Sequence, residues 1–382
     1  MNNRDIVNTL SSRLAEKSPL IQVLIGPRQI GKTTALKEVL KKKGIYKTAD
    51  YPTPLGSEII IDWWKEVENS KDKILAIDEI QKIVNWSETI KYLWDQSSDI
   101  KLILTGSSSL QVEKGLSETL AGRFEIIRAE HWNYNEAKNV FNLNLKEFIE
   151  YGCYPGSVTF LKDIKRWSSY IRDSIVEPAI GRDLLQIHPI ENPSLMRQIF
   201  GVAVSKPAQL ISLQKLQGSL QEKGTVPTIG NYLRLLSEAF LITGIQKYSP
   251  AQIRVRKSIP KLIVHDNALC RAFERPVTEK ISQEKFGRYF ENIIGARFIE
   301  SGWDTYYWKH RKLEVDFVVV GPENQKWAIE VKSSKIKVSE LKGIFEFCKV
   351  YPDFTPCLIS LENQEFDNIK TIKFEDILSL KR

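Results

Sequence analysis

The stretch that decides the fold is GPRQIGKTT, which runs from Gly26 to Thr34. An apolar run, IQVLI, precedes it, and a lysine-rich run of helix-forming residues, ALKEVLKKK, follows its two threonines. The stretch fits the pattern G-x-x-x-x-G-K-[ST], in which glycines let successive backbone N–H groups point inward at phosphate oxygens. A helix that starts at such a loop adds the partial positive charge of its N-terminus. The sequence therefore predicts a strand, a phosphate-binding loop and a helix, in this order.

We expect the whole loop to contact a nucleoside triphosphate, ATP, together with Mg²⁺. Lys32 would reach the terminal phosphates, and the hydroxyl of Thr33 would hold the magnesium. A strand-to-helix turn that binds nothing is the alternative, and the flanking strand and helix argue against it. The predicted nucleotide-binding residues are Gly26, Pro27, Arg28, Gln29, Ile30, Gly31, Lys32, Thr33 and Thr34.

Two further apolar runs end in polar side chains. KILAIDEIQ continues into Asp78 and Glu79, and IKLILTGSSSL passes through Thr105 to Ser107. Strands covered on both faces have continuous apolar runs, and the carboxyl ends of parallel strands meet at the edge where ligands bind. We expect Asp78 to hold the magnesium and Glu79 to orient or deprotonate the attacking water. Thr105 and Ser107 would sense the terminal phosphate. An ordinary strand cap and a plain loop are the alternatives.

Taken together, these motifs resemble the AAA-type ATPases of bacteria and archaea that carry a C-terminal region of unknown function. The resemblance rests on GPRQIGKTT, LAIDEIQ, LILTGSSS and LAGRFEIIRAEHWNYNEA, includes YGCYPGS further on, and extends over nearly the whole chain. It implies that Arg123 in LAGRF stabilises charge on the transferring phosphoryl group, in its own chain or in a neighbouring one. Arg128 is a competitor for this role. A purely structural tie between helix and sheet is the alternative for Arg123.

The middle of the chain is predicted to be helical, and the resemblance places a lid there. Further on, three helix candidates precede two short strand candidates that flank the basic segment QIRVRKSIPK. This order is typical of a winged helix. Arg254, Arg256 and Lys257 would then contact the phosphates of double-stranded DNA. A packing module with a basic, solvated hairpin is the alternative.

The end of the chain returns to mixed strands and helices. Asp316 lies in EVDFVVV, and Glu330 and Lys332 lie in AIEVKSS, across a predicted hairpin through GPENQ. Glu291 lies on the preceding helix. The pattern resembles the D…(D/E)-x-K fold of restriction endonucleases, helicase-associated nucleases and Holliday-junction resolvases. The resemblance implies two carboxylates that share magnesium and a lysine that activates water. An inert binding module of the same fold is the alternative, since Glu-x-Lys also occurs elsewhere in the chain.

Composition sets wider limits. The 382 residues suffice for several domains, and a net charge of +8 with many acids is compatible with a phosphate-bearing partner. The four cysteines form no CxxC pair, and the four histidines are far apart in the sequence, which argues against a zinc site. No apolar run has the length of a signal-peptide core or a membrane span, so we expect a cytoplasmic protein with reduced thiols and no membrane partner.

We therefore predict an α/β protein that hydrolyses ATP with magnesium and uses its nucleotide state to control a DNA-binding or nuclease-like C-terminal region. A nucleotide-gated, metal-dependent DNA nuclease and a non-catalytic nucleotide-sensing scaffold for a protein partner are the alternatives. A homo-oligomer is compatible with the sequence. The predicted parts are a P-loop AAA-type ATPase core (1–144), a helical lid (145–192), a winged-helix domain (193–275) and a restriction-endonuclease-like α/β domain (276–382).

Overall fold

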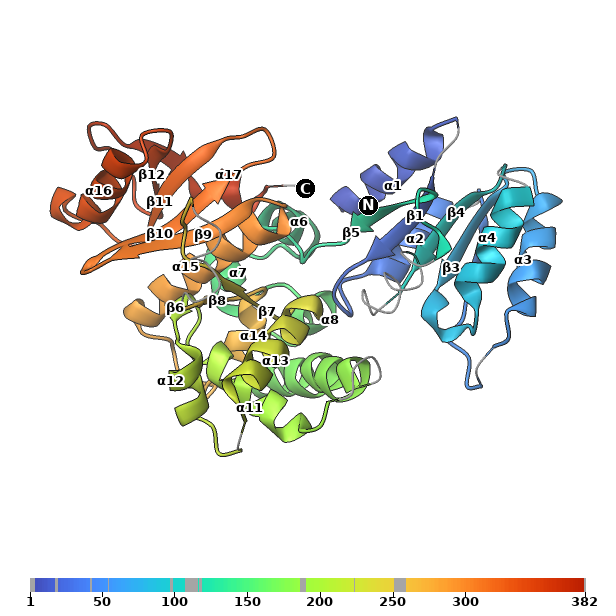
Figure 1. Ribbon diagram of the computed structural model, residues 1–382, viewed down its shortest axis with the longest axis horizontal. Coiled ribbons are helices and arrows are strands. Elements are labelled where there is room, and N and C mark those ends of the chain that lie inside the picture. The colour runs from blue at the N-terminus through green and yellow to red at the C-terminus, as the bar shows by residue number, and fades with distance from the viewer. Residues whose placement is uncertain are drawn as a thin grey trace. The chain divides into compact units, whose positions relative to one another are not determined.

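The computed structural model shows two compact units, one up to residue 130 and one from residue 131 onward (Figure 1). We call them the first unit and the second unit. Each has its own sheet and its own buried core. The structure describes residues 4–17, 20–41, 43–53, 55–96, 99–106, 116, 119–185, 190–222, 224–250 and 259–380.

The first unit contains a five-stranded parallel sheet with the strand order β2-β3-β4-β1-β5. The three predicted strands are confirmed, and β2 and β5 are additions to the sequence prediction. The strands are β1 (Ile21–Ile25), β2 (Ile45–Thr48), β3 (Ile74–Asp78), β4 (Lys101–Thr105) and β5 (Phe124–Arg128). The helical segments are α1 (Asp5–Ala15), α2 (Lys32–Leu40), α3 (Glu58–Glu68), the 3-10 turn η1 (Ile80–Lys82) and α4 (Trp86–Gln96).

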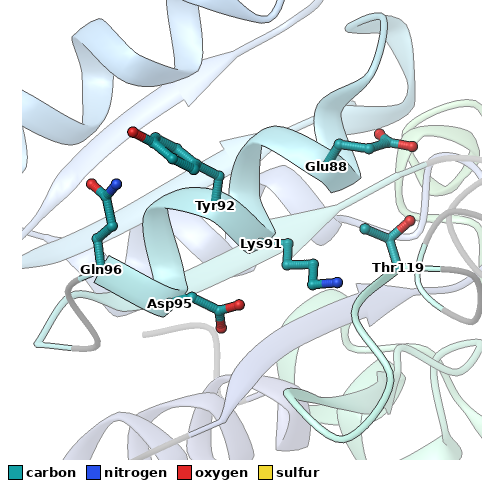
Figure 2. Close-up of a pocket in the computed structure, with 6 residues that line it drawn as sticks. All are labelled: Glu88, Lys91, Tyr92, Asp95, Gln96 and Thr119. Atoms are coloured by element: carbon teal, nitrogen blue, oxygen red, sulfur yellow. The ribbon is translucent and has the colours of Figure 1, made fainter.

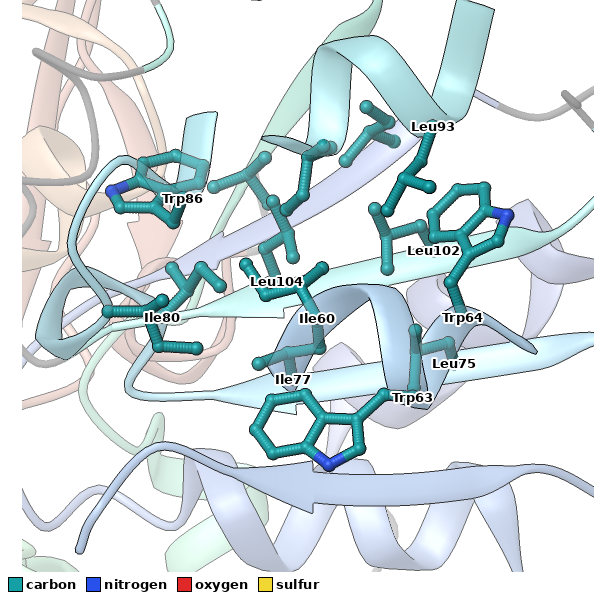
Figure 3. Packing of buried hydrophobic residues seen from close by; sticks show 14 of the residues in the cluster. Ile60, Trp63, Trp64, Leu75, Ile77, Ile80, Trp86, Leu93, Leu102 and Leu104 are labelled. Atoms are coloured by element: carbon teal, nitrogen blue, oxygen red, sulfur yellow. The ribbon is translucent and has the colours of Figure 1, made fainter. Parts of the chain in front are cut away.

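The core of the first unit lies between this sheet and the helices α3 and α4. Apolar residues of α3 recur at Ile60, Trp63, Trp64 and Val67, which places them on one helical face. This face packs against the buried side chains of β3 and β4 (Figure 3). Burial of each large apolar side chain stabilises the fold by roughly 2 kcal/mol. The continuous apolar runs of β3 and β4 therefore anchor the sheet edge at which the polar residues follow.

The second unit begins with helices and a small antiparallel sheet of order β6-β8-β7. The predicted helical character of this region is confirmed. Its helical segments before the sheet are α6 (Tyr134–Phe141), α7 (Leu145–Tyr151), α8 (Pro155–Val158), α9 (Ile164–Tyr170), the π-helical segments η2 (Ile171–Val176) and η3 (Ala179–Leu184), and α11 (Pro193–Val204). There follow β6 (Gln209–Leu210), α12 (Leu213–Gly218), α13 (Val226–Glu238), β7 (Ile242–Ile245), β8 (Lys261–Val264) and α14 (Asn267–Arg271).

The second unit also contains a five-stranded mixed sheet of order β13-β12-β11-β10-β9. The strands β9, β10 and β11 are antiparallel, whereas β11, β12 and β13 are parallel. The predicted hairpin and the long helix before it are confirmed, and β13 and α17 are additions. The elements are α15 (Gln283–Glu300), β9 (Asp304–His310), β10 (Leu313–Val320), β11 (Lys326–Lys332), η5 (Val338–Leu341), α16 (Lys342–Val350), β12 (Thr355–Ser360), β13 (Lys370–Lys373) and α17 (Phe374–Leu378).

The finer division of the chain into four parts stays a prediction. The helix α7 packs within the second unit, where the amide of Asn267 donates to the carbonyl of Ile149 at 2.7 Å and to that of Tyr289 at 2.9 Å. Among the residues that the structure describes, no helix is both long and apolar enough to cross a membrane.

Candidate functional site

The glycine-rich loop begins where β1 ends. The N–H of Ala129 donates to the carbonyl of Ile25 at 2.7 Å, which ties the start of the loop to the end of β5. A Cβ atom at Gly26 would lie 2.1 Å from the carbonyl oxygen of Ala129, so only glycine fits there. Gly31 has space around it but adopts a φ of +93°, a left-handed conformation that glycine accepts at little cost. The two glycines therefore serve different needs, close backbone approach and backbone conformation.

The side chain of Lys32 lies over the loop that it follows. It is 8% exposed, and its ammonium donates to the carbonyl of Gly26 at 2.9 Å and to that of Pro27 at 2.7 Å. The lysine is thus held at the loop at which phosphates are expected to bind. These carbonyl contacts are neutral acceptors, and a phosphate oxygen is a stronger, charged acceptor for the same ammonium.

Asp78 is the centre of the hydrogen-bond network at this edge of the sheet. Its Oδ2 accepts from the hydroxyls of Thr33 at 2.6 Å and Tyr46 at 2.9 Å. Its Oδ1 accepts from the hydroxyl of Thr105 at 2.5 Å and from the N–H of Glu79 at 3.1 Å. An ionised carboxylate satisfies all four donors. A carboxylate beside a threonine hydroxyl is also an oxygen pair of the kind that magnesium prefers, so these residues fit a magnesium ion.

Glu79 has an unusual backbone conformation for a residue with a side chain. Its φ and ψ are 56° and 41°, which is the left-handed region. Its Oε2 accepts from the amide of Gln81 at 2.6 Å. Strained residues held by their surroundings are frequent at functional sites. The backbone of Glu79 is therefore not that of a right-handed helix, and the hydrogen bond from Gln81 holds its carboxylate.

Tyr46 belongs to this network, although the sequence analysis did not single it out. Burial, followed by the negative charge of Asp78, raises the pKa of Tyr46 well above its usual value. The phenol is therefore a stable hydrogen-bond donor to Asp78. No local pattern marks Tyr46, because the stretch IYKT that forms β2 has only one aliphatic residue and is only partly buried.

Arg123 lies at the opposite edge of the sheet from the phosphate loop. The N–H of Ile21, at the amino end of β1, donates to the carbonyl of Arg123 at 2.9 Å, whereas the loop leaves the carboxyl end of β1. The guanidinium binds both oxygens of Asp95 on α4, at 2.8 and 3.0 Å. The structure therefore does not bring Arg123 together with Lys32. By contrast, Arg128 pairs with Ile25 in the register of β1 and β5, at the edge of the loop.

A pocket of about 510 Å³ is lined by Asp95, the partner of Arg123, and by other residues of α4 (Figure 2). None of its lining residues belongs to the predicted nucleotide site. They are Glu88, Lys91, Tyr92, Asp95, Gln96 and Thr119.

Four predicted site residues lie outside the residues that the structure describes. They are Ser107, Arg254, Arg256 and Lys257. Their roles stay predictions.

The predicted acidic residues of the second unit come together at the centre of its mixed sheet. Phe317 pairs with Ile329 in the register of β10 and β11, which brings Asp316 and Glu330 to neighbouring positions. The Oδ2 of Asp316 accepts from the N–H of Val331 at 2.9 Å. The ammonium of Lys332 lies 2.8 Å from Glu330. The hairpin therefore brings Asp316, Glu330 and Lys332 close together.

A fifth charged residue, Lys261 of β8, joins this cluster without having been predicted. Its side chain is 1% exposed, and its ammonium lies 2.5 Å from Oε1 of Glu291 and 3.7 Å from Oδ1 of Asp316. Burial raises the pKa values of the carboxyl groups of Glu291 and Glu330, and the charge of Asp316 raises them further. No local sequence pattern marks Lys261, because more than fifty residues separate it from Asp316.

Glu314 lies near Lys261, but within the described part of the chain no hydrogen bond joins its carboxylate to Asp316, Glu330 or Glu291. The pairing of β9 and β10 shifts between Val315 and Val318, so β10 is irregular at Asp316. The carboxylate of Glu314 instead forms an ion pair with Lys309 at 2.8 Å. In a regular strand Glu314 and Asp316 would lie on one face, and the irregularity of β10 removes this relation.

The second unit also buries two histidines beside a glutamate. His131, His265 and Glu300 offer ligand atoms within 4.8 Å of one another, although the histidines are far apart in the sequence. Nδ1 of His131 bonds to Oε1 of Glu300, and Nδ1 of His265 lies 3.1 Å from the same oxygen. The other oxygen of Glu300 accepts from Arg297 at 3.1 Å. The rings bond at Nε2 to Tyr154 at 3.1 Å and to the hydroxyl of Thr243 at 2.8 Å. This is a buried ion-pair network with its own internal cation, so we do not assign a metal to it.

The network predicts a pH-dependent stability. Burial alone would lower the pKa of His131, but the charge of Glu300 and its hydrogen bond raise it above 6.5. The same contacts hold the pKa of Glu300 far below 4.5. The contribution of His131 to the free energy of unfolding is therefore fully present below about pH 6.5, and it is lost as the pH rises through the raised pKa. Over that range the free energy of unfolding falls by at most about 1.4 kcal/mol per pH unit. The nearby Asp266, whose pKa burial raises, acts in the same direction.

Replacement of His131 by asparagine should flatten the fall in stability above pH 6.5. Differential scanning calorimetry of the full chain at several pH values measures this dependence of stability on pH. The exposed His310 provides the matched control, since His310→Asn should leave the profile unchanged. Equal profiles for wild type and His131→Asn would contradict the assignment.

Residues 18–138 match the family described as AAA domain. Residues 142–280 and 286–379 match two families described as domains of unknown function, DUF8612 and DUF4143. The chain therefore carries an AAA-type P-loop ATPase domain followed by two domains of unknown function. This confirms the resemblance drawn from the motifs.

The chain is also similar to uncharacterized relatives and to a solved structure. Uncharacterized protein MJ1544 of Methanocaldococcus jannaschii is 26% identical over 388 residues, covering 93% of this chain and 82% of its own. An uncharacterized protein of Haemophilus influenzae is 23% identical over 325 residues, covering 78% and 79%. The Walker-type ATPase PABY2304 of Pyrococcus abyssi has 14% identity and a TM-score of 0.46, over 72% of this chain and 96% of that chain.

Proposed function

We propose that this protein binds ATP with magnesium at the glycine-rich loop and hydrolyses it. The observation that carries the proposal is the contact of the Thr33 and Thr105 hydroxyls with one carboxylate, Asp78, at the sheet edge that continues into the loop. Thr33 and Asp78 would hold the magnesium, which supplies charge neutralisation on the phosphates. Lys32 would exchange its carbonyl contacts for oxygens of the terminal phosphates.

The remaining residues would act on water and on the transferring phosphoryl group. Glu79, held by Gln81, is the candidate to orient or deprotonate the attacking water. Thr105, and Ser107 outside the described residues, are the candidates to sense the terminal phosphate. Because Arg123 lies at the opposite sheet edge, any role for it in catalysis would be in the site of a neighbouring copy. Arg128 is the better-placed arginine for the site of its own chain.

The second unit would respond to the nucleotide state. The element order α11, β6, α12, α13, β7, β8 with its small antiparallel sheet supports the winged-helix interpretation. The convergence of Glu291, Asp316, Glu330 and Lys332 supports the nuclease-like interpretation. Arg254, Arg256 and Lys257 are the proposed DNA contacts. A nucleotide-gated DNA nuclease is therefore the second candidate function.

Phosphate release from ATP by the full chain tests this proposal. We expect release that requires magnesium and stops in excess chelator, because Thr33 and Asp78 act through the ion. Addition of double-stranded DNA should raise the rate if the second unit binds duplex, and the increase should fall with salt. Tight ATP binding without turnover, and without any effect of DNA, would instead favour the sensing scaffold.

A further inference from the structure

The carboxylate cluster of the second unit holds a lysine that the nuclease-like pattern does not require. The ammonium of Lys261 lies 2.5 Å from Glu291 and 3.7 Å from a carboxylate oxygen of Asp316. It also donates to the backbone carbonyl of Asp316 at 3.1 Å. The cation therefore lies between Asp316, one of the two strand carboxylates that would share a metal ion, and Glu291, the helix glutamate that would complete its shell.

This position of the ammonium is firmly held. Lys261 is 1% exposed, and its ammonium lies 4.8 Å from the centre of the Phe317 ring. Its strand, β8, is the central strand of the small sheet, where Lys261 pairs with Leu210 on one side and Ile245 on the other. The carboxylates of Glu291 and Asp316 lie beside the ammonium, as a buried cation requires. The contacts on several sides therefore hold the ammonium in the cluster.

The cluster in this arrangement does not fit a divalent metal. Three carboxylates, those of Glu291, Asp316 and Glu330, face two ammonium groups, those of Lys261 and Lys332. A buried ammonium needs such carboxylate partners. A second cation beside Lys261 would be repelled by it and would compete for the same oxygens. The nuclease resemblance implies a bound metal ion. These residues could hold such an ion only after the ammonium of Lys261 leaves the cluster.

We propose that Lys261 is an internal cation that fills the metal position between Glu291 and Asp316 and keeps the cluster closed to divalent metal. The proposal rests on the nuclease-like interpretation of the second unit and is independent of ATP hydrolysis by the first. A displacement of β8 opens the cluster, whereas β8 in the position described here closes it.

Binding of Mn²⁺ alone to the full chain, without nucleotide, tests the proposal by calorimetry and electron paramagnetic resonance. Wild-type protein should show no Asp316-dependent Mn²⁺ binding below about 1 mM, because Lys261 occupies the oxygens. Lys261→Met, which keeps the volume and removes the charge, should bind Mn²⁺ roughly a hundredfold more tightly. Asp316→Asn in the Lys261→Met background should abolish that binding. Lys332→Met is the matched control and should create no new site, since Lys261 remains.

Several outcomes would overturn the proposal. The first is that Lys261→Met folds but does not bind Mn²⁺ more tightly than wild type. The second is that Lys332→Met gains as much Mn²⁺ affinity as Lys261→Met does. Lys261→Gln replaces Lys261→Met if the latter does not fold. If neither folds, the wild type decides, because Asp316-dependent binding at micromolar Mn²⁺ contradicts a closed cluster. ATP turnover of the same samples reports separately on the first unit, so failure of either proposal is recognisable.

Discussion

Replacement of Lys32 by alanine is expected to reduce ATP turnover by roughly a hundred- to a thousandfold and to weaken ATP binding. The ammonium is held over the loop by the carbonyls of Gly26 and Pro27, within reach of bound phosphates. Its loss removes a charged donor from the ground state and from the transition state alike. Phosphate release at saturating ATP and calorimetric titration with ATP measure the two effects.

A second lysine of the same helix region provides the control for this experiment. Lys41 is exposed and pairs with Glu38 at 2.8 Å, so Lys41→Ala should leave turnover and affinity unchanged. Thermal unfolding of both variants excludes a loss of fold, since the loop carbonyls lose a donor in Lys32→Ala. Turnover of Lys32→Ala within threefold of wild type, a change of about 0.7 kcal/mol, would contradict the proposed site.

The strands of the first sheet show which parts of the fold can be predicted from sequence. β1, β3 and β4 are buried on both faces, and the apolar runs of β3 and β4 are therefore continuous in the sequence, whereas the buried Gln22 interrupts that of β1. β2 and β5 form the two edges of the sheet and are mostly only partly buried, and polar residues interrupt their short apolar stretches. Partial burial removes the signal that the central strands carry.

The candidate sites also differ in how much of them can be predicted from the sequence. The contacts among Thr33, Asp78 and Thr105 follow from parallel strands that end at one edge, which a sequence can reveal. The positions of Tyr46 and Lys261 depend on which strands become neighbours and how they align, which no local pattern encodes. The same is true of the buried His131 and its distant partners.

Arg123 illustrates the limit of a motif for placing a residue. Its sequence position after the predicted strand that ends at Thr105 is compatible with either sheet edge, because the strand that follows Arg123 was not predicted. Since β5 starts directly after Arg123 and runs parallel to β1, Arg123 lies at the amino edge and Arg128 at the loop. With β5 recognised in the sequence, Arg128 rather than Arg123 would have been the first candidate for the nucleotide site of its own chain.

Replacement of Glu79 by glutamine is expected to separate ATP binding from ATP hydrolysis. Glutamine keeps the size of the side chain and an oxygen that accepts from Gln81, but it cannot take a proton from water. Turnover should fall roughly a hundred- to ten-thousandfold, the usual contribution of a positioned general base. ATP affinity should stay within threefold of wild type, about 0.7 kcal/mol, because Lys32 and Asp78 remain.

Comparison with Lys32→Ala distinguishes a defect in the chemical step from a defect in ATP binding, since Lys32→Ala should lose both binding and turnover. Glu66→Gln is the matched control, because Glu66 is an exposed carboxylate of α3 that pairs with Lys47 at 2.6 Å. If Glu79→Gln retains wild-type turnover, Glu79 does not act on the water. The left-handed backbone at Glu79 would then require a structural explanation, and the sensing scaffold would gain support.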